Sequence, residues 1–93
     1  MMFDAERRIE EWHDRKYDKV TLAATYRKLL EEVGELGERL IEKDFPGAYE
    51  EAADSLAVLT HLVRSLGGEL EDALSFAASK VELREAAEAA GKE

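Results

Sequence analysis

The chain has no cysteine, no long apolar run and few basic residues, and each scarcity excludes a class of protein. Without cysteine there can be no disulfide bridge, thiolate zinc site or cysteine nucleophile, and a reducing, cytoplasmic location is expected. No stretch approaches the ~18 consecutive apolar residues of a membrane helix, and acids stand where a signal peptide needs an apolar segment. Neither export nor membrane insertion is therefore expected.

Positive charge is scarce, with 13 lysine and arginine residues against 22 acidic ones and a formal net charge of -9. A surface this negative repels the backbone of nucleic acids and anionic lipids, so neither is expected as a partner. An anionic nucleotide could still bind if a divalent cation reversed the local field. The acidity therefore favours cation binding.

Proline and glycine are also sparse, at one and six residues, which predicts long helices. Between the breaks, apolar residues recur at three- and four-residue steps, as on one face of a helix. We expect an all-α fold, a compact antiparallel bundle of about four helices. The helices should span residues 4–17, 21–43, from the break at 44–47 to 66, and 70 to about 90, with connectors at 18–20 and 67–69.

The length of 93 residues indicates one domain over 1–93, with a tail from about residue 86 that can fray. At this size folding removes only about 60–65% of the surface of the unfolded chain, so the core is often completed by another subunit. An oligomer is expected before any motif is considered.

Acidic residues are paired on both central helices. Glu31, Glu32 and Glu35 share one side of the second predicted helix, and Glu51 and Asp54 stand three residues apart on the third. Carboxylates at this spacing repel one another, and a divalent cation turns that repulsion into coordination. Hard oxygen ligands favour Mg²⁺, with Mn²⁺ as a substitute.

Periodicity alone also allows structural roles for these acids. On the second helix Glu35 lies almost opposite the apolar stripe of Tyr26 and Val33, which favours a solvated face. If Glu35 does bind metal, the stripe must face the chain's own core while the acids face the third helix or a partner subunit.

Asp54 is the only formal charge between residues 52 and 63, so it should be buried or nearly so and should need a cation or hydrogen bonds. The structural alternative is that the acids favour the positive end of a helix or pair with a basic residue. The expected partners would be Lys80, Arg64 or Arg39.

The pattern Glu-Glu-x-x-Glu at Glu31 to Glu35, followed 15 residues later by Glu-x-x-Asp at Glu51 to Asp54, resembles the signature of the MazG-like nucleotide pyrophosphohydrolases. The resemblance extends from about Phe3 to Arg84. It implies an all-α oligomer, a homodimer or homotetramer, that uses Mg²⁺ to hydrolyse nucleoside triphosphates between the α and β phosphates. The products would be a monophosphate and pyrophosphate.

The resemblance also implies roles for individual residues. The metal ligands would be Glu32, Glu35, Glu51 and Asp54. Glu31 would hold a second metal or orient water, so that Glu31 and Glu35 would act as catalytic residues.

Further residues would bind the substrate. Trp12 and His13 match a segment placed near the nucleobase, and Lys80 and Arg84 match a basic pair that neutralises phosphate. Trp12 could equally be an ordinary core residue, and the basic pair equally suits a helix C-terminus. Several relatives carry asparagine where this chain has Ala78.

Two other functions are compatible with the same residues. Related enzymes act on dUTP-like nucleotides or phosphoribosyl-ATP, and a non-catalytic dimerisation or regulatory module would leave the acids solvated. No Walker-type glycine loop is present, which agrees with metals holding the phosphates. His61, seven residues after Asp54, is expected to be a core histidine.

Overall fold

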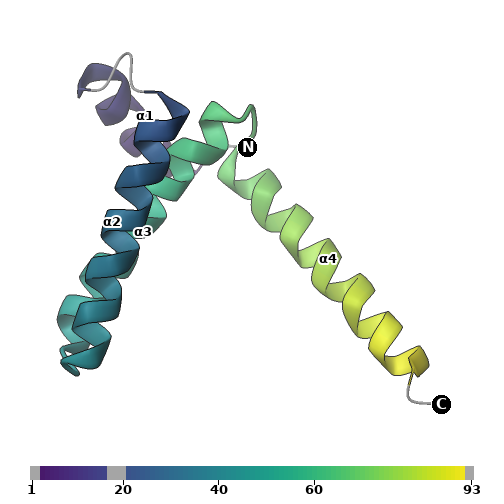
Figure 1. Ribbon diagram of the computed structural model, residues 1–93. Coiled ribbons are helices and arrows are strands. Elements are labelled where there is room, and N and C mark those ends of the chain that lie inside the picture. Colours follow the sequence, from purple (N-terminus) through teal and green to yellow (C-terminus); the bar gives the residue numbers. More distant parts are fainter. Residues whose placement is uncertain (1–2, 17–20, 92–93) are drawn as a thin grey trace.

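The computed structural model describes residues 3–16 and 21–91, and this part of the chain consists of helices joined by turns (Figure 1). The all-α class and the expected number of helices are confirmed. The connector expected at residues 18–20 lies outside the described residues. The helices are α1 (Asp4–Lys16), α2 (Leu22–Ile41), α3 (Phe45–Ser65) and α4 (Leu70–Gly91).

Local chemistry sets the helix ends. Thr21 caps α2, since its side chain accepts a hydrogen bond from the backbone N–H three residues on at 3.1 Å. Asp44 caps α3 in the same way at 3.0 Å, and Pro46 occupies the first turn, where its missing N–H costs nothing. Gly67 follows the end of α3 with a φ of +95°, a conformation that glycine adopts without steric cost.

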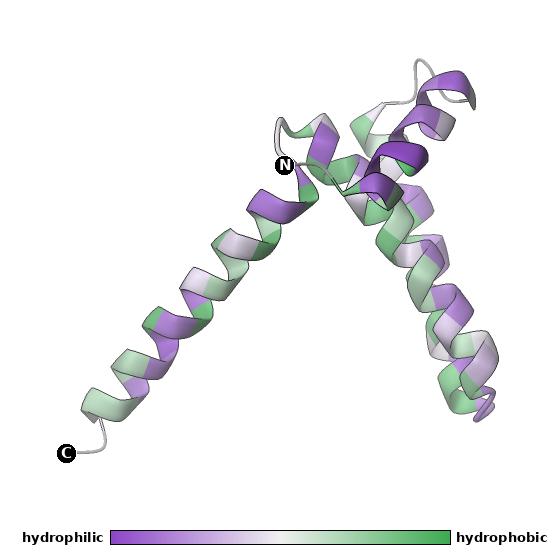
Figure 2. Ribbon diagram, turned by 180° about the vertical axis from the view of Figure 1, so that it is seen from behind, coloured by the Kyte–Doolittle hydropathy of each residue, from purple (hydrophilic) through white to green (hydrophobic). Residues whose placement is uncertain are grey.

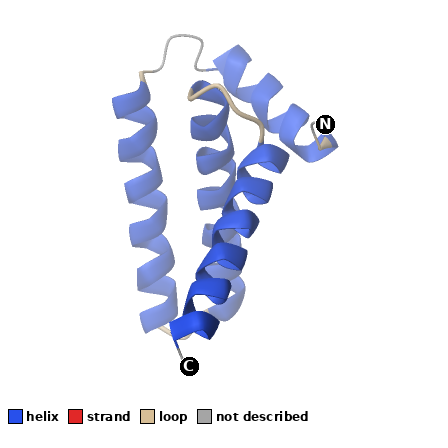
Figure 3. Cartoon of the chain, turned by 90° about the vertical axis from the view of Figure 1, so that its right-hand side faces the viewer, coloured by secondary structure: helices blue, strands red, loops and turns tan. Residues whose placement is uncertain are grey.

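Helices α2 and α3 form an antiparallel hairpin, and α1 lies against the C-terminal half of α3 (Figures 1 and 3). Helix α4 contacts α3 near its start and then diverges from the hairpin (Figure 1). The radius of gyration is 16.3 Å, against about 12 Å for a compact chain of this length. The expected compact bundle is therefore formed only in part.

The interior of the single chain is mostly polar. Among the described residues, the buried hydrophobic ones are Ala48 and Val58. The apolar stripe of α2, expected to face the chain's own core, is instead about half exposed at Tyr26 and Val33. No helix of the described residues combines the length and apolarity needed to cross a membrane. The buried polar residues are Glu6, Glu10, His13, Thr25, Glu32 and Thr60.

Candidate metal and nucleotide site

Three acids from α2 and α3 meet on one side of the hairpin. Glu32, Glu35 and Glu51 each contribute one carboxylate oxygen to a group in which all three oxygens lie within 4.8 Å of one another. Glu32 and Glu35 stand one turn apart on α2, and Glu51 reaches them from α3. The acidic side of α2 thus faces α3, which is one of the two surfaces expected if Glu35 binds metal.

This acidic cluster of Glu32, Glu35 and Glu51 is largely withdrawn from water. Glu32 is buried, the other two are half-buried, and Glu51 Oε2 is buried without a hydrogen-bond partner. Loss of hydration, followed by the adjacent carboxyl groups of Glu35 and Glu32, raises the pKa of Glu51 from 4.5 to about 7. The cluster therefore holds its full negative charge poorly near neutral pH, and a divalent cation would relieve that repulsion.

Lys28 partly offsets this charge. Its Nζ lies 3.1 Å from Glu32 Oε1 and 3.7 Å from Glu31 Oε1. The hydrogen bond to Glu32 raises the pKa of Lys28, which keeps the ammonium group charged. Lys28 was not predicted from the sequence, although its spacing of four residues from Glu32 is that of a helical ion pair.

Two of the three basic residues considered as structural partners, Arg64 and Arg39, pair with other acids. Arg64 Nε lies 3.8 Å from Glu10 Oε2, and Arg39 lies 3.3 Å from Glu42 and 4.0 Å from Asp44. These described ion pairs do not involve the acidic cluster.

Asp54 and Glu31 lie outside the acidic cluster. The expectation that Asp54 is buried is wrong, because it is exposed on the side of α3 that borders a pocket rather than under a packed helix. Glu31 is exposed as well and pairs with Lys28. The metal-binding role of Asp54 and the catalytic role of Glu31 stay predictions.

A pocket of about 450 Å³ lies between α1, α2 and α3 and shares Glu32 with the acidic cluster. This volume is within the usual range for small-molecule sites. Trp12 and His13 both line it, with ring centroids 5.0 Å apart and ring planes at 80°. The lining residues are Trp12, His13, Ala24, Thr25, Lys28, Glu32, Asp54, Ala57, Val58 and His61.

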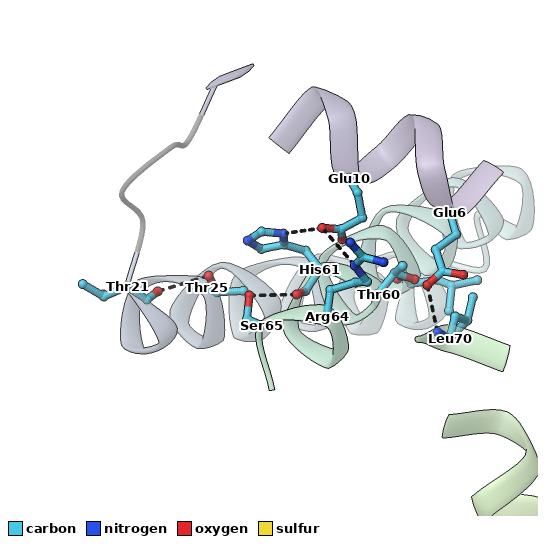
Figure 4. Close-up of polar contacts among 10 residues, drawn as sticks. Glu6, Glu10, Thr21, Thr25, Thr60, His61, Arg64, Ser65 and Leu70 are labelled. Carbon is cyan, nitrogen blue, oxygen red and sulfur yellow. Dashed lines mark hydrogen bonds and ion pairs between the residues drawn. The ribbon is translucent and has the colours of Figure 1, made fainter. Parts of the chain in front are cut away.

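His61 belongs to the wall of this pocket, so it is more than a core histidine. Its ring stacks on that of His13 with centroids 4.3 Å apart and planes at 10°. Its Nδ1 lies 3.4 Å from Glu10 Oε2, which also pairs with Arg64 (Figure 4). The signal in the sequence was the step of three residues from Val58 to His61, which places His61 one turn along the pocket side of α3.

Burial shifts the pKa values of Glu10 and His13, which lie beside His61. Loss of hydration raises the pKa of Glu10, while His61 and Arg64 oppose that rise. Loss of hydration and the neighbouring His61 lower the pKa of His13, so its ring is neutral at neutral pH and can both donate and accept hydrogen bonds.

Lys80 and Arg84 lie on α4, whose residues are exposed from Leu74 onward. Lys80 Nζ sits 5.4 Å from the centroid of the Phe76 ring. Neither basic residue lines the pocket in a single chain. Their contact with phosphate stays a prediction.

No protein-family model, curated protein or solved structure matches this chain.

Proposed function

We propose that this protein is a Mg²⁺-dependent nucleoside triphosphate pyrophosphohydrolase that cleaves between the α and β phosphates. The observation that carries the proposal is the acidic cluster, with three carboxylate oxygens within 4.8 Å of one another, beside a pocket of about 450 Å³. Trp12 and His13 in the pocket wall suit a planar heterocycle. A cation site beside an aromatic pocket would suit the charged phosphates and the planar base of a nucleotide.

The residues of the cluster fit a divalent cation. Glu32, Glu35 and Glu51 would hold it, because they supply hard oxygen donors and because Glu51 Oε2 is buried without a hydrogen-bond partner. When bound, the cation would polarise phosphate oxygens and lower the pKa of a water molecule. Asp54, at the edge of the pocket, is the proposed fourth ligand.

Other residues of the pocket would bind and orient the nucleotide. Trp12 is 43% exposed and can stack on the base, and the neutral His13 can hydrogen-bond to its edge. Lys28, the basic residue among those that line the pocket, would offset phosphate charge. Lys80 and Arg84 remain proposed phosphate contacts.

The exposed apolar surface of the hairpin favours a second candidate function, a non-catalytic dimerisation or regulatory module. In that case the acids keep the protein soluble, and Lys28 offsets part of the charge of the acidic cluster through its ion pair with Glu32. Such a module would release no pyrophosphate, and its melting temperature would not respond to Mg²⁺.

A substrate screen separates these candidates. Pyrophosphate release would be measured from the common ribo- and deoxyribonucleoside triphosphates, dUTP and phosphoribosyl-ATP, with Mg²⁺ or Mn²⁺ and with a chelator. We expect release from at least one substrate and its loss on chelation. Absence of release from every substrate, or release that persists in the chelator, would refute the metal-dependent enzyme.

A further inference from the structure

Helix α1 packs on α3 through a row of polar side chains. Glu6, Glu10 and His13 recur at steps of four and three residues, so they share one side of α1, and each is at most 9% exposed. The helix is mostly hydrophilic (Figure 2), and its Trp12 is 43% exposed. A helix on the surface of a protein ordinarily buries its apolar side. The buried row of α1 therefore needs an explanation other than core packing.

This row leads into the pocket through a chain of contacts. Glu10 Oε2 lies 3.4 Å from Nδ1 of His61 and 3.8 Å from Nε of Arg64 (Figure 4). The His61 ring stacks on that of His13 with centroids 4.3 Å apart, and the His13 ring meets Trp12 edge to face at 5.0 Å. The three rings line the pocket, whereas Glu10 does not. Glu10 therefore reaches the pocket through His61.

The carboxylate of Glu10 is costly to bury. It is 7% exposed, and among the described residues its Oε1 has no hydrogen-bond partner. Its other oxygen lies beside the imidazole of His61. A carboxylate next to Nδ1 favours a proton on that nitrogen and fixes the orientation of the ring. Glu10 can therefore orient a ring that forms part of the pocket wall.

We propose that Glu10 and His61 are positioning residues for the nucleobase, with Glu10 fixing the ring of His61 and His61 fixing the ring of His13; this assignment rests on the proposed function. Trp12 is held in the same array by its edge contact with His13. Rings that are already held in place lose little freedom when a planar ligand binds, so less affinity is lost to ordering them.

His61 also affects the charge of His13. Loss of hydration and then the neighbouring His61 lower the pKa of His13, and the neutral ring keeps an acceptor nitrogen for the edge of a base. Protonation removes that acceptor. An uncharged ring at position 61 should therefore raise the pKa of His13. The charged groups described around the two rings are Glu10 and Asp14 on α1, Lys28 and Glu32 on α2, and Asp54 and Arg64 on α3.

The test is the binding of deoxynucleoside monophosphates to the full chain with Mg²⁺, followed by the NMR signal of the Trp12 indole N–H, which is the chain's one tryptophan. His61→Ala and Glu10→Ala should each raise the dissociation constant about tenfold. His61→Phe keeps a ring and Glu10→Gln keeps a hydrogen-bond acceptor, so both should bind nearly as the wild type does at pH 7.5. Glu11→Ala, on the exposed side of α1, is the matched control and should leave the constant unchanged.

The dependence on pH separates positioning from a merely structural role. As the pH falls, His61→Phe should lose affinity at a higher pH than the wild type, and histidine NMR should show a raised pKa of His13. Glu51 titrates in both proteins, so it does not produce this difference. If the alanine variants lose helicity by circular dichroism, the comparison of His61→Phe with the wild type carries the test.

Unchanged dissociation constants in folded alanine variants would overturn the positioning role. Coincident pH profiles of His61→Phe and the wild type would overturn it too, as would the absence of any response of the indole signal to the monophosphates. Pyrophosphate release is measured separately on the same preparations. Release with unchanged constants would refute the positioning role alone. Binding that the alanine variants weaken, without release from any triphosphate, would refute the proposed hydrolysis and leave the positioning role intact.

Discussion

At the residue scale, Glu51 couples the acidic cluster to pH. Its pKa in the folded chain is about 7, against 4.5 as the ordinary value, so between these pH values the folded state binds a proton that the unfolded state has released. Stability from this group is therefore present below pH 4.5 and is lost as the pH rises through about 7. The cause is the crowding of Glu51 by Glu35 and Glu32 together with its loss of hydration.

We therefore predict that Glu51→Gln stabilises the metal-free chain at pH 8 and has little effect at pH 4.5, because the neutral amide resembles the protonated acid. Thermal unfolding at both pH values in a chelator measures the difference. Mg²⁺ at pH 8 should raise the melting temperature of the wild type and leave that of the variant unchanged. An equal effect of Glu51→Gln at both pH values would contradict the raised pKa.

Trp12 tests the pocket as the site of the nucleotide. Trp12→Ala should raise KM by about 5- to 150-fold, since stacking on a base is worth about 1–3 kcal/mol. The melting temperature should change little, because Trp12 is 43% exposed. Trp12→Phe, which keeps an aromatic face, should retain most of the affinity. If alanine and phenylalanine gave the same KM as the wild type, Trp12 would not contact the base.

At the element scale, the start of α4 is held by a residue far away in the sequence. Glu6 of α1 is 1% exposed, and its Oε2 accepts a hydrogen bond from the Leu70 backbone N–H at 2.8 Å (Figure 4). That N–H belongs to the first turn of α4 and has no acceptor within the helix. Glu6 thus connects α1 to the point where α4 leaves the hairpin.

Loss of this contact should be measurable in the free energy of unfolding. We predict that Glu6→Ala destabilises the chain by about 1–3 kcal/mol, because it removes a nearly fully buried acceptor and leaves the part-buried N–H of Leu70 unsatisfied. Glu11→Ala on the exposed side of α1 is the control and should cost less than about 0.5 kcal/mol. Urea unfolding of the two variants compares them directly. Equal destabilisation would mean that the carboxylate of Glu6 does not hold α4.

The sequence predicted the ends of the helices better than it predicted which side chains are buried. Thr21, Asp44 with Pro46, and Gly67 mark helix ends through local hydrogen bonds and backbone conformation, so they could be identified without the fold. Glu32 and Glu35 could be placed together because helical spacing fixes their separation.

Burial could not be predicted in the same way. Asp54 stands in an apolar stretch, yet its exposure depends on where α1 lies across α3. The apolar stripe at Tyr26 and Val33 was assigned to the chain's own core, but periodicity does not specify which molecule covers a stripe. His61 lines the pocket because it contacts Glu10 and His13 on α1, and helical spacing within α3 does not predict contacts with another helix.

At the scale of the whole molecule, we propose that this elongated chain completes its core by association with a second copy. Its extents are 54 × 36 × 25 Å. Among the described residues the buried hydrophobic ones are Ala48 and Val58, whereas large apolar side chains on α2 and α3 are exposed. A dimer that covered these exposed side chains would link folding to protein concentration by mass action.

We predict that the melting temperature of the wild type rises with protein concentration, whereas that of Leu30→Asp does not. Differential scanning calorimetry at concentrations a hundredfold apart would measure this. A melting temperature of the wild type that is independent of concentration would indicate that association does not contribute to stability in this range.

The most direct test of the proposed activity is the identity of the products, resolved by ion-exchange chromatography after incubation of the full chain with a nucleoside triphosphate and Mg²⁺. Glu51→Gln removes a proposed ligand, and Glu50→Gln, one residue earlier and exposed, is the matched control. We predict equal amounts of nucleoside monophosphate and pyrophosphate from the wild type and Glu50→Gln, and neither product from Glu51→Gln. Diphosphate with inorganic phosphate, or full activity in Glu51→Gln, would contradict it.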